Sequence, residues 1–195
     1  MKLLTIYILV IITLTSYGQT RDPYSNENKN GLNSFKTFIG RFKVLSFPFI
    51  AKTDCYNPDS LISVPLNMDN DSGFIDYVGP AVTIGLFPDT TNFYAVFYCT
   101  ASFCYLPTIA VFTKDGKRLS KEQISNACGS GVGYICSDSL TISSMTDIRQ
   151  QLIEETFNVD KNGIEIPNSW KKEITINNFS IDKFGLINKK EEKKK

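Results

Sequence analysis

The chain has 195 residues, of which 21 are basic and 20 are acidic, and it contains no histidine. This near-balance of charge argues against a nucleic-acid-binding protein, because such proteins need an excess of basic side chains to neutralise phosphates. The absence of histidine excludes Ser-His-Asp and Cys-His catalysis, and with them every zinc or iron site that has a histidine ligand.

The first 18 residues have the composition of a secretory signal. One lysine precedes an apolar run from Leu3 to Leu14, and the small residues Ser16 and Gly18 follow it. The run is short for a membrane span, so residues 1–18 are predicted to be a cleaved signal peptide, the alternative being an uncleaved N-terminal anchor. No cysteine lies near the cleavage site, which argues against a lipoprotein. We therefore expect a secreted or periplasmic protein with no stable membrane span after cleavage.

The remaining chain divides into three parts by composition. Residues 19–33 are polar and charged and are predicted to form a flexible leader. Residues 34–188 are enough for a single β-rich domain with a core of its own. Residues 189–195 comprise five lysines and two glutamates and are predicted to be a charged, disordered tail, with weak attraction to an anionic surface as the alternative.

The domain is predicted to begin with one short amphipathic helix. Phe35, Phe38, Ile39 and Phe42 recur at helical spacing, and Asn33 or Ser34 is available as the N-cap. Burial of such a stripe is what stabilises a short helix, so we expect these side chains to pack on a sheet.

Strands are predicted for most of the rest of the domain, because aromatic and β-branched residues favour a pleated surface. Asp115-Gly116 supplies a hairpin turn, and Asp160 to Gly163 and Asp182 to Gly185 repeat its pattern. The fold class is therefore mainly β, an antiparallel meander arranged as an open sheet, a sandwich or a propeller-like assembly. The predicted strands are 44–50 (extended, at an edge), 93–99, 109–112, 134–136, 147–157, 164–166 and 172–181, with a type I′ turn at Asn162-Gly163.

One acidic segment is a candidate calcium site. Oxygen-bearing side chains alternate at Asn67, Asp69 and Asp71, and Asp76 follows. The glycine that a calcium loop needs at its sixth position is one residue late, so an Asx-rich turn is the competing interpretation. A second stretch that begins at Asn158 matches the start of such a loop but has Ser169 where the bidentate glutamate belongs, which favours the hairpin turn.

The five cysteines predict disulfides, because exported compartments are oxidising. Two local bonds are expected, Cys99–Cys104 and Cys128–Cys136, with Cys55 left over, although spacing alone does not choose among the pairings. Neither pair has the Cys-x-x-Cys spacing of redox motifs, so a structural role is expected.

Three other features have competing interpretations. The glycines that follow Cys128 suggest a phosphate loop, but the next residues look like a strand rather than a helix, so a sharply turning, disulfide-closed loop is expected. Glu154 and Glu155 are adjacent on a strand and point to opposite faces, which favours a solvated edge over a catalytic pair. Trp170 could stack on a sugar, but a lid on the core is the expectation.

Several of these segments together resemble a known group of proteins. The Gly18-Gln19 junction, the segment from Phe38 to Phe49, the turn at 113–117 and the Cys128-Gly129 loop are similar to β-rich exported proteins of Bacteroidota that have no assigned activity. The resemblance implies an exported or envelope location and no particular chemistry. Proteins of this kind often carry a lipoprotein cysteine, which this chain lacks.

These observations favour an exported, non-catalytic binding or structural module that contacts a protein or glycan partner and needs no cofactor. A carboxylate-dependent glycan hydrolase is the first alternative, because such enzymes need only two acidic side chains on either side of a cleft. A calcium-stabilised interaction module is the second. The first alternative predicts two carboxylates in one cleft.

Overall fold

The structure is a computed structural model that describes residues 29–53, 64–66, 71, 73–76, 79–101, 105–125 and 128–194. The predicted signal peptide lies outside these ranges, as does most of the predicted leader. Among the described residues, no helix combines the length and apolar character needed to cross a membrane. The elements are helix α2 (Lys29–Gly40) and strands β1 (Phe49–Thr53), β2 (Pro65–Leu66), β3 (Ala81–Leu86), β4 (Tyr94–Ala101), β5 (Tyr105–Phe112), β6 (Arg118–Gln123), β7 (Tyr134–Ser144), β8 (Asp147–Thr156), β9 (Lys171–Ile181) and β10 (Ile187–Lys194).

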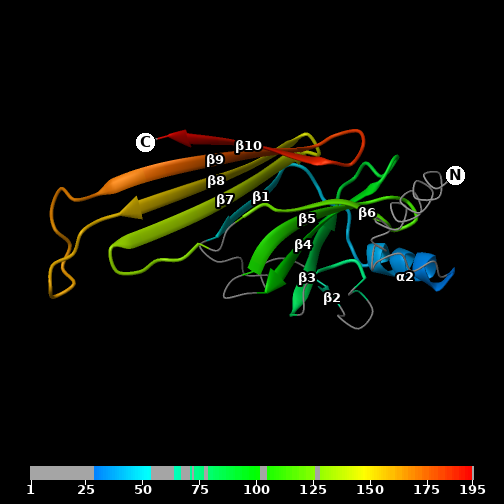
Figure 1. Cartoon of the computed structure of the whole chain (residues 1–195), viewed down its shortest axis with the longest axis horizontal. Helices are drawn as coiled ribbons and strands as arrows, with labels where there is room; N and C mark the ends of the chain where they lie inside the picture. The colour runs from blue at the N-terminus through cyan, green and yellow to red at the C-terminus, as the bar shows by residue number, and fades with distance from the viewer. Residues whose placement is uncertain are drawn as a thin grey trace, which may run out of the picture.

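The strands form two antiparallel sheets of five strands each (Figure 1). Sheet A has the order β2-β3-β4-β5-β6, and sheet B has the order β1-β7-β8-β9-β10. Along the sequence, β1 belongs to sheet B, the next five strands form sheet A, and β7 to β10 form the rest of sheet B. The predicted mainly β, antiparallel fold is confirmed, with two meanders in place of one. The predicted edge strand at 44–50 is confirmed only at its end, since β1 lies at the edge of sheet B but begins at Phe49.

A hydrophobic core joins the two sheets. Phe97 and Ile109 of sheet A pack in one cluster with Leu140, Ile148 and Phe179 of sheet B, and all five side chains are buried. Successive residues of a strand point to opposite faces, so this cluster uses only one face of each sheet. The arrangement is a sandwich over the part of sheet B that faces sheet A.

Helix α2 covers the other face of sheet A. Phe35, Phe38 and Phe42 are buried against Tyr98 and Phe112, as the amphipathic pattern predicts. The helix begins at Lys29, earlier than predicted, so it occupies part of the predicted leader. The expected N-cap at residue 33 or 34 is wrong, because an apolar residue at 32 extends the helical period by one step and the polar residues between are tolerated within the helix.

The three predicted turns are present and share one geometry. The glycine N–H at the fourth position donates to the carbonyl of the first residue, and Gly116, Gly163 and Gly185 have φ angles of 94°, 80° and 80°. Glycine adopts this left-handed conformation without the steric penalty of a Cβ. At Gly163 the predicted type I′ turn is wrong, because Asn162 does not have the positive φ that type I′ requires.

The C-terminal segment is a strand where a disordered tail was predicted. Residues 187–194 pair with β9 along their whole length, so β10 is the second edge of sheet B. Composition misled the prediction because an edge strand needs only one hydrogen-bonding partner, and lysines are common at edges, where they discourage aggregation. Lys189 additionally lies over the ring of Phe179, with its Nζ 5.7 Å from the ring centroid.

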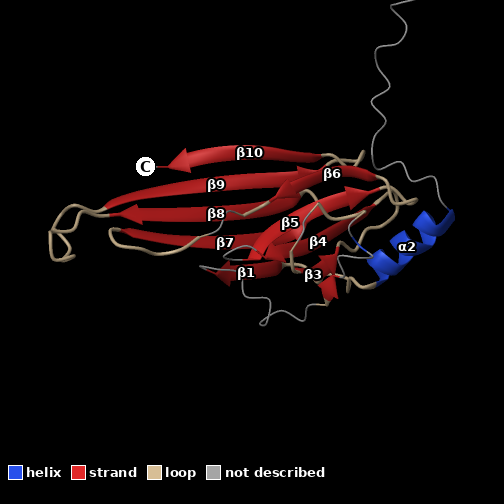
Figure 2. Ribbon diagram, turned by 60° about the horizontal axis from the view of Figure 1, so that its bottom comes forward, coloured by secondary structure: helices blue, strands red, loops and turns tan. Residues whose placement is uncertain are grey.

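Sheet B is longer than sheet A and extends beyond it (Figures 1 and 2). We call the strand segments 134–137, 153–156 and 171–174 the projecting end of sheet B. In both views the loop between β8 and β9 reaches furthest from helix α2. Among the described residues, no strand of sheet A covers the inner face of the projecting end, and part of that face is an open hollow.

Candidate functional site

An open hollow of about 570 Å³ lies on the projecting end. The strand register explains its composition, because Tyr134, Thr156 and Lys171 are paired across three neighbouring strands and therefore share one face. The next row on that face contains Glu154 directly opposite Glu173. The hollow is lined by Tyr134, Glu154, Thr156, Lys171, Lys172 and Glu173.

Glu154 and Glu173 form a like-charged pair across β8 and β9. Directly opposite residues have Cβ atoms about 4.5–5.5 Å apart, and two like charges in this position destabilise a sheet by a fraction of a kcal/mol. Glu173 lies 3.7 Å from the ammonium of Lys193, and Glu154 accepts a 2.9 Å hydrogen bond from the hydroxyl of Tyr134. A like-charged pair directly opposite in a sheet is a local conflict of the kind that proteins carry at functional sites.

The phenol of Tyr134 is fixed by this site. Burial raises the pKa of Tyr134 above its ordinary value, and both the hydrogen bond to Glu154 and the charge of that carboxylate raise it further. The phenol therefore remains protonated at neutral pH and acts as a hydrogen-bond donor. Its hydrogen bond engages one oxygen of the Glu154 carboxylate.

A disulfide ties the base of the projecting end to the loop that follows sheet A. The predicted Cys128–Cys136 bond is confirmed, and its two Cα atoms are 5.4 Å apart. Cys136 pairs with Glu154 in the register of β7 and β8, so the bond lies next to the hollow. It closes the glycine-rich loop, in which Gly133 has a φ of 74° and a Cβ would lie 2.7 Å from the carbonyl oxygen of Phe157.

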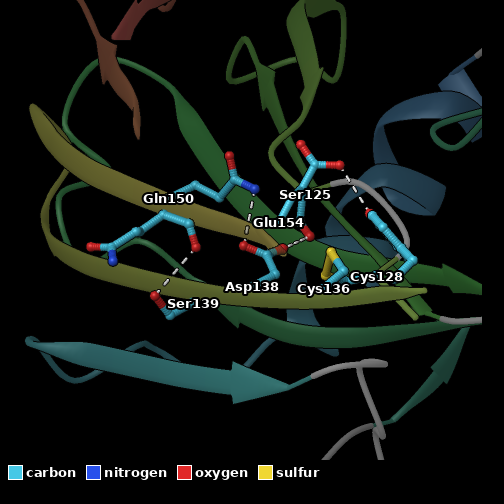
Figure 3. Close-up of a disulfide and its surroundings, with 9 residues drawn as sticks. Ser125, Cys128, Cys136, Asp138, Ser139, Gln150 and Glu154 are labelled. Atoms are coloured by element: carbon cyan, nitrogen blue, oxygen red, sulfur yellow. Dashed lines mark hydrogen bonds between the residues drawn. A yellow bond between two sulfur atoms is a disulfide. The ribbon is translucent and has the colours of Figure 1, made fainter. Parts of the chain in front are cut away.

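Buried polar side chains of β7, β8 and β9 form a hydrogen-bonded chain beside the disulfide (Figure 3). Ser125 and Gln150 both point at the carboxylate of Asp138, which accepts a hydrogen bond from the Ser125 hydroxyl and one of 2.9 Å from the Gln150 amide. Asn177 in turn donates to the Gln150 carbonyl at 2.6 Å. Burial raises the pKa of Asp138, while its hydrogen bonds to Ser125 and Gln150 oppose that rise.

The projecting end of sheet B and its loops expose apolar side chains. We call Val132, Ile135, Ile164, Ile166 and Trp170 the apolar tip. Trp170 stacks on Phe157 with ring centroids 4.4 Å apart, and its indole N–H donates to Glu165. Trp170 is only half buried, so the predicted core lid is wrong. It follows a loop that extends past the ends of β8 and β9, away from the core between the sheets.

The two described residues of the predicted calcium site, Asp71 and Asp76, each form ion pairs with basic side chains. Asp71 is buried in an ion pair with Arg41, and Asp76 is paired with Arg118 at 2.7 Å and Lys121 at 3.0 Å. Burial by itself would raise the pKa of Asp76, but its interactions with Arg118 and Lys121 outweigh this effect and lower the pKa. Within the described ranges there is no group of three acidic or cysteine side chains that could hold a metal ion. Asn67 and Asp69 lie outside the described residues.

The second predicted disulfide is not formed at Cys99. This cysteine is a free thiol, fully buried in β4, and burial raises its pKa. In the hairpin register Pro107 of β5 lies opposite Cys99. Cys104 and Cys55 lie outside the described residues.

The two adjacent glutamates have different environments, as expected of neighbours on a strand. Glu155 pairs with Lys172 at 2.8 Å, whereas Glu154 faces the hollow. The predicted solvated edge is wrong, because β8 is the central strand of sheet B. Sequence reasoning missed the pairing of Glu154 with Glu173, because period-two alternation assigns each glutamate to a face but does not give the register between the two strands. The turn at Gly163 suggested residues 164–166 as the partner strand. In the structure β8 already ends at Thr156, and the loop after it has only one isolated bridge, between Val159 and Glu165.

Comparison with known proteins gave no match, whether to protein-family models, to curated proteins or to solved structures. The functional argument therefore rests on the geometry of the projecting end.

Proposed function

We propose that this protein is an exported, non-catalytic binding module whose ligand occupies the hollow on the projecting end of sheet B. The observation that carries the proposal is the hollow itself, which is open, of ligand size and lined by polar groups of mixed character. Ligand sites in proteins are commonly about 300–1,000 Å³, so a volume of about 570 Å³ is suited to a small ligand or one segment of a polymer.

The lining favours a polyhydroxylated ligand. Glu154 and Glu173 accept hydrogen bonds, Lys171 donates them, and the hydroxyl of Thr156 does both. A sugar hydroxyl also donates and accepts, so it can satisfy both kinds of group at once. A glycan segment is therefore the ligand class that fits the lining best.

Glycan hydrolysis is the second candidate, and one observation favours it. Glu154 and Glu173 are directly opposite on neighbouring strands, so two carboxylates face the same hollow, as a glycosidase requires. The openness of the hollow argues for binding without cleavage, because general acids are usually enclosed in apolar surroundings. Tyr134 and Lys193 already engage the two carboxylates.

The test is titration calorimetry of the protein with soluble β-glucan, xylan, mannan and chitin oligosaccharides. Binding to one of these is expected, and Glu154→Gln and Glu173→Gln should each weaken it about tenfold or more, as loss of a charge-assisted hydrogen bond implies. Glu192→Gln, on the opposite face of β10, is the matched control. Mass spectrometry of the same mixtures separates the two candidates, because only a hydrolase releases shorter products. No binding to any of the four classes would refute the glycan assignment.

A further inference from the structure

We propose that the apolar tip inserts into the interface of a lipid bilayer and docks the protein on a membrane surface. This inference goes beyond ligand binding in the hollow and does not depend on it. All five tip side chains are exposed to solvent. Their exposed fractions are 83% for Val132, 64% for Ile164, 43% for Trp170, 42% for Ile166 and 39% for Ile135.

The order of side chains along the tip matches the layers of a bilayer interface. Ile164 and Ile166 belong to the loop that reaches furthest from sheet A, and Trp170 directly precedes β9 (Figure 1). Lys171 and Lys172 are the first residues of β9 and follow immediately. Aliphatic side chains favour the acyl region, tryptophan favours the boundary, and lysine extends to the headgroups. Ile164, Ile166, Trp170 and the two lysines would meet a membrane in that order, while Ile135 lies at the level of the lysines, in one row with Glu155 and Lys172.

Backbone polar groups of the loop between β8 and β9 are hydrogen-bonded within the loop, which suits an apolar environment. A buried N–H or C=O without a partner costs free energy, and in lipid there is no water to replace that partner. Here the backbone N–H of Asp160 donates to the carbonyl of Ile164 at 2.8 Å. The N–H of Ile166 donates to the carbonyl of Asn158 at 2.9 Å, and the N–H of Gly163 donates to the carbonyl of Asp160 at 3.0 Å. The Asp160 carboxylate also accepts from the N–H groups of Asn162 and Ile164 at 2.8 and 2.9 Å. The loop can therefore enter the interface without leaving these donors unpaired.

The charges of the loop favour shallow insertion. Its acidic groups are engaged within the protein, Asp160 by backbone N–H groups and Glu165 by the Trp170 indole. Lysines at 161, 171 and 172 surround the apolar side chains and suit anionic headgroups. A stable protein interface usually involves about 20–30 residues on each side, more than two narrow loops present. A bilayer needs no such complementary area.

The experiment uses Trp170, the only tryptophan in the chain, as a native reporter. The protein is mixed with vesicles of phosphatidylcholine alone and of phosphatidylcholine with one quarter phosphatidylglycerol. Expected results are a blue shift of the tryptophan emission, protection from acrylamide quenching, and co-sedimentation that is stronger with the anionic vesicles. Ile164→Asp should weaken partitioning about tenfold, since it replaces a large apolar side chain with a charge.

Leu186→Asp is the matched control, because Leu186 is a similarly exposed aliphatic residue on the β9–β10 turn, far from the tip. It should bind vesicles like the parent, and far-UV circular dichroism should show both variants folded. Absence of a spectral shift and of co-sedimentation with both vesicle types would overturn the proposal and leave a protein partner for the tip. Equal losses for the two variants, or co-sedimentation without a shift at Trp170, would also overturn it. Glycan titration is unaffected by these outcomes, so the two proposals fail separately.

Discussion

Replacement of Phe38 by alanine tests whether helix α2 is an integral layer of the fold. Phe38 is fully buried, and its ring lies 4.9 Å from that of Phe74, 5.1 Å from that of Phe42 and 5.8 Å from that of Phe112. These rings come from the segment before β3, from the residues just after the helix and from sheet A, respectively. Phe38 therefore occupies the centre of the cluster that attaches the helix.

The expected loss of stability follows from the removed ring. Truncation of a buried phenylalanine to alanine costs about 3–5 kcal/mol, because the ring leaves a cavity that neighbours fill only in part. At roughly 2–4 °C per kcal/mol for a chain of this size, Tm should fall by roughly 6–20 °C. Urea unfolding followed by far-UV circular dichroism measures the free energy, and calorimetry measures Tm.

Phe184→Ala is the control for this measurement. The ring of Phe184 is largely exposed on the β9–β10 turn, so its removal should change stability by no more than about 0.5 kcal/mol. If Phe38→Ala lost less than about 1 kcal/mol, or no more than the control, the reasoning would be refuted. The helix would then contribute little to the core of sheet A.

Three further predictions concern the site and its supports. Replacement of Cys128 and Cys136 together by serine should cost about 2–3 kcal/mol, because the bond closes a loop between cysteines eight positions apart; an unchanged urea midpoint would count against this. Burial raises the pKa of Asp138, so its contribution to stability is complete below the ordinary aspartate pKa and declines as pH rises through the folded-state pKa. Asp138→Asn should flatten this decline in the free energy of unfolding, measured by urea titration from about pH 4 to about pH 8. An equally steep profile in the variant would contradict the assignment. Because Asp71 and Asp76 are neutralised by basic side chains, Tm should be the same in calcium and in chelator, and a calcium-dependent rise would restore the calcium hypothesis.

Local patterns were sufficient to predict much of the fold. The stripe from Phe35 to Phe42 identified the helix, and the three Asp-containing turns identified chain reversals, because both depend on residues close in sequence. The Cys128–Cys136 bond was equally local. The glutamates at 154 and 155 were assigned to opposite faces for the same reason.

Long-range register was what the sequence could not supply. The pairing of Glu154 with Glu173 spans a loop that makes its own small turn, so the obvious local hairpin gave the wrong partner. The strand nature of 187–194 depends on β9, which offers an edge that composition does not reveal. The position of Trp170 was missed because its exposure depends on how far sheet B runs past sheet A.

The difference in strand length between the sheets explains why both candidate surfaces lie at one end. β7 and β9 each have 11 residues, whereas β4 and β5 have 8, so sheet B is longer by roughly 10 Å at about 3.3 Å per residue. An overhang of this length leaves the inner face without a second layer, and polar residues such as Glu154 and Glu173 are what that face requires. Solubility alone would also require polar loops beyond it, yet these loops carry exposed apolar side chains. This departure from the simplest expectation is the strongest reason to seek the biological contacts of the protein at the projecting end.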